Sequence, residues 1–147
     1  FENVIRTNLI GTFHCTKHVL PYMREQGYGH IINFGQGNVS NDRVADSLGA
    51  CVYHVSKVSI RAFTSEVAFE EKDNNICIVS MGPGGGEGAI PGRRGIATDE
   101  TPEDNRYKMN WVADIVEDRY LLAADAPMEL SGKQITVRNG KLAATQD

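Results

Sequence analysis

A tyrosine and a lysine four residues apart are the side chains in this sequence best suited to acid–base chemistry. They stand in the segment Tyr53-His54-Val55-Ser56-Lys57. If this segment is helical, the two side chains lie on one face about one turn apart. An ammonium so close to a phenol favours the phenolate, which suits the phenol to transferring a proton near neutral pH. The pair predicts a general acid or base, although the same spacing also occurs in plain surface pairs.

A metal-dependent chemistry has weaker support. His14 and His18 are four residues apart, and imidazoles at this spacing can ligate a metal, but no third ligand accompanies them. The cysteines Cys15, Cys51 and Cys77 lie far apart and show no CxxC spacing. We therefore expect no metal site and no disulfide scaffold.

The elements that must position the Tyr–Lys pair follow from the spacing of apolar residues. Apolar side chains at three-, four- and seven-residue steps predict a helix from residue 1 to about residue 26, ended by Gly27-Tyr28-Gly29. A second helix is predicted from about residue 50 to residue 72, with Val52, Val55, Ile60, Phe63 and Val67 on its apolar side. The pair thus stands near the start of the second helix.

Short apolar runs predict two strands, at residues 30–34 and 76–81. The segment 134–138 predicts a third strand, with a turn at Asn139-Gly140. Between the last two strands, a glycine-rich loop at residues 82–95 precedes a helix start at Thr101-Pro102-Glu103-Asp104 and a helical pattern from about Asn110. Strands that alternate with helices predict an α/β fold, in which a parallel sheet carries helices on both faces.

Composition limits the function further. The chain has 147 residues, of which 41% are hydrophobic, and a net charge of −4, which together indicate one globular domain or a large piece of one. Beyond Arg93 and Arg94 there is no basic cluster, so we expect no nucleic-acid partner. No window approaches 18 uncharged apolar residues, and Glu2 and Arg6 stand where a secretory signal has its apolar core. We expect a cytoplasmic protein without a membrane partner.

Several stretches together resemble the short-chain dehydrogenase/reductase family along nearly the whole chain. They are Asn8-Leu9-Ile10-Gly11-Thr12-Phe13, Leu20-Pro21-Tyr22-Met23, Gly29-His30-Ile31-Ile32-Asn33, Tyr53-His54-Val55-Ser56-Lys57, Gly82-Pro83-Gly84 and Leu130-Ser131-Gly132-Lys133-Gln134. The resemblance implies a Rossmann-like, three-layer α/β fold, and hydride transfer between the nicotinamide of NAD or NADP and a small alcohol or carbonyl substrate.

The resemblance also implies roles for particular residues. Tyr53 would protonate the carbonyl oxygen or deprotonate the alcohol. Lys57 would favour the ionised form of Tyr53 and hold the nicotinamide ribose, and Asn8 would support a water that leads to Lys57. Pro83 and Gly84 would lie beside the nicotinamide.

One catalytic position of the family has two candidates in this sequence. The family's serine, which polarises the substrate oxygen, falls on Gln36 when counted from Asn8 and on Ser40 when counted back from Tyr53. Ser40 is delivered by a longer loop, or Gln36 donates an amide hydrogen bond instead, or the site is impaired.

The family's glycine-rich turn, which holds the cofactor pyrophosphate, has no counterpart in these residues. The segment Gly84–Ala89 formally fits G-x-G-x-x-A, but Pro91 and Gly92 follow where the phosphate-binding helix should begin. Residues 1–147 are therefore expected to be the C-terminal part of a single Rossmann-like domain, incomplete at the N-terminus and inactive alone. The family's pairing of helices implies a homodimer or homotetramer. The alternative is a catalytically silent relative that acts as a binding or oligomerisation module.

Overall fold

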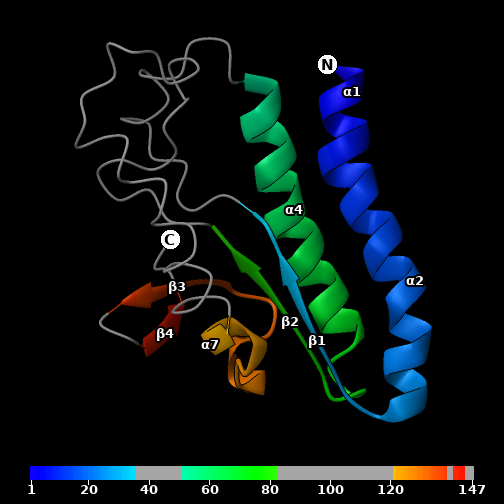
Figure 1. Ribbon diagram of the computed structural model, residues 1–147, viewed down its shortest axis with the longest axis vertical. Helices are drawn as coiled ribbons and strands as arrows, with labels where there is room; N and C mark the ends of the chain where they lie inside the picture. Colours follow the sequence, from blue (N-terminus) through cyan, green and yellow to red (C-terminus); the bar gives the residue numbers. More distant parts are fainter. Residues whose placement is uncertain (36–50, 83–120, 139–140, 145–147) are drawn as a thin grey trace, which may run out of the picture.

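The computed structural model describes residues 1–35, 51–82, 121–138 and 141–144. These residues form a four-stranded sheet in the order β1-β2-β3-β4, with two long helical segments on one face and two short helices on the other (Figure 1). The expected α/β architecture, a Rossmann-like parallel sheet between layers of helix, is confirmed. The helices expected between residues 101 and 120 lie outside the described residues.

The first helical segment is continuous but changes its winding near its start. It comprises α1 (Glu2–Ile5), the π-helical turn η1 (Arg6–Ile10) and α2 (Gly11–Gln26). The backbone N–H of Gly11 donates to the carbonyl of Arg6, five residues back, which defines the wider π turn. The segment ends at Gly27, within the predicted stop Gly27-Tyr28-Gly29, and Gly27 has the left-handed conformation with φ 76°.

A strand–helix–strand unit forms the centre of the fold. β1 (Gly29–Asn33) pairs in parallel with β2 (Ile76–Met81), from Gly29 opposite Ile76 to Asn33 opposite Ser80, and α4 (Cys51–Glu70) connects them. Because α4 runs antiparallel to both strands, its first turns lie near the carboxyl end of β1 (Figure 1). The carboxyl end of parallel strands is where α/β proteins bind ligands.

The core lies on both faces of β2, whose six residues are all buried. Ile76 and Ile78 pack with Leu20, Val67 and Ala68 of the two long helices. On the other face, side chains of β2 pack with the residues around α7 and with β3, in a cluster of Cys77, Val79, Met81, Ala123, Ala126 and Ile135. This alternation is what a strand covered on both faces requires.

The last part of the described chain adds two short helices and two strands, α7 (Leu121–Ala124), η4 (Met128–Leu130), β3 (Gln134–Arg138) and β4 (Lys141–Ala144). β3 pairs in parallel with β2, whereas β4 pairs with β3 antiparallel and was not expected from the sequence. The parallel sheet therefore has one additional antiparallel strand. The turn expected at Asn139-Gly140 lies outside the described residues.

An ion pair joins the carboxyl-terminal ends of the two long helices. Arg24, near the end of α2, donates from Nε to Oε2 of Glu71 at 3.0 Å and from Nη2 to Oε1. Asn74 donates to the same carboxylate at 2.7 Å, and Glu71 is fully buried. The hydrogen bond from Arg24 is the main reason why the pKa of Glu71 lies below its usual value near 4.5.

The set of buried residues on α4 differs partly from the sequence prediction. Ile60 and Val67 are buried as expected, but Val55 is 47% exposed and lies outside the core. None of the helices in the described ranges is long and apolar enough to cross a membrane.

Candidate active site

The Tyr–Lys pair lies on one face of α4, in its first two turns. The Nζ atom of Lys57 is 5.7 Å from the centroid of the Tyr53 ring. Tyr53 is 43% exposed, whereas Lys57 is half-buried. The helical arrangement expected for this pair is therefore what the structure contains.

Lys57 is held at the carboxyl end of β1. Its Nζ donates to the backbone carbonyl of Phe34, the residue that follows β1, at 2.9 Å. Partial burial lowers the pKa of Lys57 below its ordinary value of 10.5. An ammonium has three N–H donors, so the bond to Phe34 leaves two for hydroxyl groups of a bound molecule.

Asn8 contacts the helix turn of α4 that carries Tyr53 and Lys57, although it belongs to a different element. It lies in the middle of the π turn η1, which packs against α4. Its Nδ2 donates to Oγ of Ser56 at 2.9 Å, and Ser56 donates in turn to the carbonyl of Tyr53 at 2.7 Å. The hydroxyl of Thr12 donates to the carbonyl of Asn8 at 2.7 Å. The Asn8 side chain is thus bonded to the helix turn that carries Tyr53 and Lys57, although Asn8 lies 45 positions before Tyr53 in the chain.

A second buried bond fixes the end of β1 to α4. Nδ2 of Asn33 donates to Oγ1 of Thr64 at 2.9 Å, and Thr64 donates to the carbonyl of Ile60 at 2.8 Å. Asn33 directly precedes Phe34, whose carbonyl accepts from Lys57. This bond therefore holds in place the backbone that anchors the lysine.

A close approach follows at Gly35. A Cβ on this residue would overlap Oγ of Ser80, which donates to Oε1 of Gln134 at 2.7 Å. The end of β1 therefore passes so close to β2 that only glycine fits there without displacing Ser80.

The other predicted site residues lie outside the described part of the chain. They are Gln36 and Ser40, the two candidates for the polarising position, and Pro83 and Gly84, expected beside the nicotinamide. Gly82, which precedes Pro83, follows β2 directly. Their roles stay predictions.

Two features of this site were not predicted from the sequence, the π turn and the part played by Ser56. Nothing in the composition of residues 6–10 signals a π turn. Ser56 carries a weak signal, because Ser56, Ile60 and Thr64 succeed one another every four residues and form one buried stripe of α4.

The histidine pair considered for metal binding is solvent-exposed. The rings of His14 and His18 stack with centroids 6.2 Å apart on the outer side of α2. Within the ranges that the structure describes, no three potential metal ligands gather.

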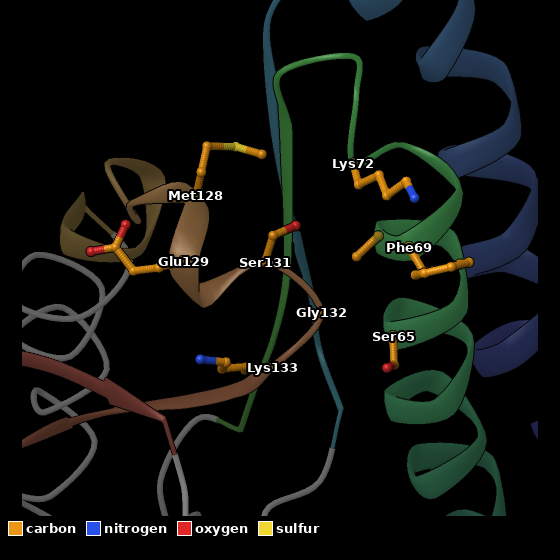
Figure 2. A pocket seen from close by; sticks show the side chains of 9 residues that line it. Ser65, Phe69, Lys72, Met128, Glu129, Ser131, Gly132 and Lys133 are labelled. Carbon is orange, nitrogen blue, oxygen red and sulfur yellow. The ribbon is translucent and has the colours of Figure 1, made fainter.

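A groove of about 630 Å³ lies at the other end of α4. Figure 2 shows it between the last turns of α4, including Ser65, and the chain that leads from η4 through Gly132 into β3. Tyr53 is twelve residues before Ser65 in the same helix, which is about 18 Å at 1.5 Å per residue. The groove is therefore separate from the candidate active site.

Comparison with known proteins places this chain in a family. The family model for short chain dehydrogenase matches residues 1–93, which include the π turn, β1, α4 and β2. The chain belongs to the short-chain dehydrogenase family.

Two curated relatives illustrate the similarity. An uncharacterized oxidoreductase, YxbG of Bacillus subtilis, is 29% identical over 155 residues, which cover 99% of this chain and 55% of that protein. The NAD(+)-dependent 2-dehydro-3-deoxy-L-rhamnonate dehydrogenase of a Sphingomonas species is 32% identical over 85 residues, 56% of this chain and 32% of the relative. The chain spans about half the length of the first of these relatives and a third of the second.

Solved structures agree on the fold. The NADPH-bound carbonyl reductase from chicken fatty liver superimposes with a TM-score of 0.65 over 91% of this chain and 53% of that one, at 17% identity. At this identity the likeness concerns the Rossmann-like fold.

Proposed function

We propose that the protein is an oxidoreductase that transfers a hydride between the nicotinamide of NAD or NADP and a small alcohol or carbonyl substrate. The observation that carries this proposal is the arrangement at the start of α4: Lys57 lies near the Tyr53 ring and donates to the backbone that follows β1, and Asn8 is bonded to Ser56 in the same helix turn. Membership of the short-chain dehydrogenase family supports it, as do the names of relatives, which are oxidoreductases, dehydrogenases and reductases.

In this proposal Tyr53 is the group that moves a proton. Its hydroxyl gives a proton to the carbonyl oxygen during reduction and takes one from the alcohol during oxidation. The nearby ammonium of Lys57 stabilises the phenolate that remains after proton donation. The bound nicotinamide supplies or accepts the hydride.

The remaining residues bind and orient. Lys57 has donors left for the ribose hydroxyls of the nicotinamide nucleotide, and its bond to Phe34 fixes the direction from which it donates. Asn8 supports a water that leads to Lys57, and Ser40 or Gln36 polarises the substrate oxygen. Pro83 and Gly84 lie beside the nicotinamide.

A catalytically silent, self-associating relative is the second candidate function. Its self-association, which the enzyme would share, is supported by apolar side chains of the long helices that remain 40 to 47% exposed: Ile10, Phe13, Val55 and Val58. Such a surface is suited to a second copy of the chain, in a homodimer or homotetramer. Both candidates are proposed to be cytoplasmic and to bind neither nucleic acid nor membrane.

The test compares Tyr53→Phe with Tyr22→Phe in the native protein. Phe keeps the ring but removes the proton, and positioned acid–base catalysis is worth roughly 10²- to 10⁴-fold, so Tyr53→Phe should lose turnover and retain nicotinamide nucleotide binding. Tyr22 is 69% exposed on α2, and its variant should remain active. Lys57→Ala should lose both turnover and nucleotide affinity. Wild-type turnover in Tyr53→Phe would show that this tyrosine is not the acid, and an inactive wild type would favour the second candidate.

A further inference from the structure

Helix α4 buries two hydroxyl groups that are bonded in the same way. Ser56 and Thr64, two helical turns apart, are both 0% exposed. Each donates to a carbonyl of its own helix, and each accepts from an asparagine amide of a neighbouring element, Asn8 in η1 and Asn33 in β1. Each hydroxyl thus connects α4 to one of the elements that pack against it.

The bonds of Ser56 determine the orientation of the Asn8 amide. The carbonyl of Tyr53 can only accept, so the single proton of the Ser56 hydroxyl is donated there. The hydroxyl oxygen can then only accept from Asn8, and the amide nitrogen rather than the amide oxygen must face it. Because Thr12 holds the carbonyl of Asn8, the side chain and the backbone of this residue are both fixed.

We propose that Ser56 is a positioning residue of the candidate active site, which holds the Asn8 amide in one orientation and ties it to the backbone of Tyr53. This inference rests on the proposed oxidoreductase function for its effect on catalysis. A serine that served only to pack α4 would need no partner on η1. The bond to Asn8 is made instead at the π turn, which an ordinary α-helical turn would shape differently.

Removal of the hydroxyl should release both partners. In Ser56→Ala the Asn8 amide has no fixed acceptor and can rotate by half a turn, and the carbonyl of Tyr53 loses its side-chain donor. In a smaller fraction of the protein molecules the Asn8 amide then has the orientation that the reaction needs, and this lowers kcat. The bond from Lys57 to Phe34 remains, so nucleotide binding is preserved. Ser56→Thr keeps the hydroxyl and should restore most of kcat.

Ser59 provides a matched control on the same helix. The hydroxyl of Ser59 donates to the carbonyl of Val55 at 2.8 Å, which is again a bond from a serine to its own helix. Ser59 is only partly buried, and its hydroxyl is not bonded to Asn8. Ser59→Ala therefore removes the same atom and the same kind of bond without touching the proposed link.

The first measurement is solvent exchange of side-chain amide protons by NMR in the native protein. In the wild type, the Asn8 amide should exchange at least tenfold more slowly than that of Asn3, which is exposed on the same helical segment. Ser56→Ala should remove this protection, and Ser59→Ala should keep it. Equal exchange of Asn8 and Asn3 in the wild type overturns the proposal even if Ser56→Ala fails to fold.

The second measurement is steady-state kinetics. Ser56→Ala should lower kcat about tenfold while the dissociation constant of the nicotinamide nucleotide changes less than twofold, and Ser56→Thr and Ser59→Ala should stay within threefold of the wild type. Lost amide protection with unchanged kcat overturns the positioning role alone, provided that Tyr53→Phe is inactive. Full activity of Tyr53→Phe overturns the proposed function and the positioning role with it.

Discussion

The bond between Asn33 and Thr64 is expected to contribute measurably to stability, because both side chains are almost completely buried. Thr64 is 0% and Asn33 is 6% exposed. In Thr64→Val the shape is nearly kept, but the Asn33 amide loses its acceptor at 2.9 Å. The carbonyl of Ile60 loses only the side-chain bond at 2.8 Å and stays within its helix.

The magnitude follows from the groups that are left unpaired. A buried hydrogen bond contributes about 1 kcal/mol net, and an unsatisfied buried donor costs about 1–3 kcal/mol. We expect Thr64→Val to reduce the free energy of unfolding by about 2 kcal/mol. For a domain of 150–250 residues this lowers Tm by roughly 4–8 °C.

Urea unfolding of the native protein, monitored by circular dichroism, measures this change. The matched control is Thr64→Ser, which keeps the hydroxyl and loses a buried methyl at a cost of about 1 kcal/mol. A double-mutant cycle with Asn33→Ala then isolates the bond, with a coupling energy of about 1 kcal/mol or more expected. If Thr64→Val were no less stable than Thr64→Ser and the coupling were zero, the reasoning would be refuted.

Two further predictions concern pH and association. The hydrogen bond from Arg24 lowers the pKa of Glu71 in the folded protein. The ionised carboxylate should therefore contribute fully to the free energy of unfolding above pH 4.5, and this contribution should be lost as the pH falls through the pKa of the folded state. Glu71→Gln should therefore be less stable than wild type at pH 7 by urea midpoint, and the difference should shrink as the pH falls below 4.5, while Glu66→Gln, at an exposed position of α4, behaves like wild type throughout. Sedimentation of the native protein at micromolar concentration should show a dimer or tetramer that Val58→Asp weakens, since Val58 is 40% exposed on α4; a purely monomeric wild type contradicts this.

Local patterns in the sequence were enough for the elements that carry strong local signals. The strands at residues 76–81 and 134–138 have the predicted bounds, because the first is an apolar run bounded by polar residues and the second alternates β-branched and polar residues before the Asn-Gly pair. Gly27 ends the first helical segment as predicted, because only a residue without a side chain adopts its left-handed conformation easily. The shared face of Tyr53 and Lys57 likewise follows from helical spacing.

Features that depend on distant partners could not be predicted. β4 contains two alanines and no β-branched residue, so its strand conformation comes from pairing with β3. Val55 fits an apolar helix pattern, but its exposure depends on which neighbouring elements cover α4. Its neighbours are set by the packing of the whole fold.

The candidate site shows the same division. The residue types at Asn8, Tyr53 and Lys57 and the family resemblance are in the sequence, and they indicate which side chains can move a proton. The bond from Asn8 to Ser56 joins residues 48 positions apart, and the bond from Lys57 to Phe34 ends on a backbone carbonyl that has no sequence signature. Side-chain chemistry is a local property of the chain, whereas the partner and orientation of each group are decided only when helices and strands pack.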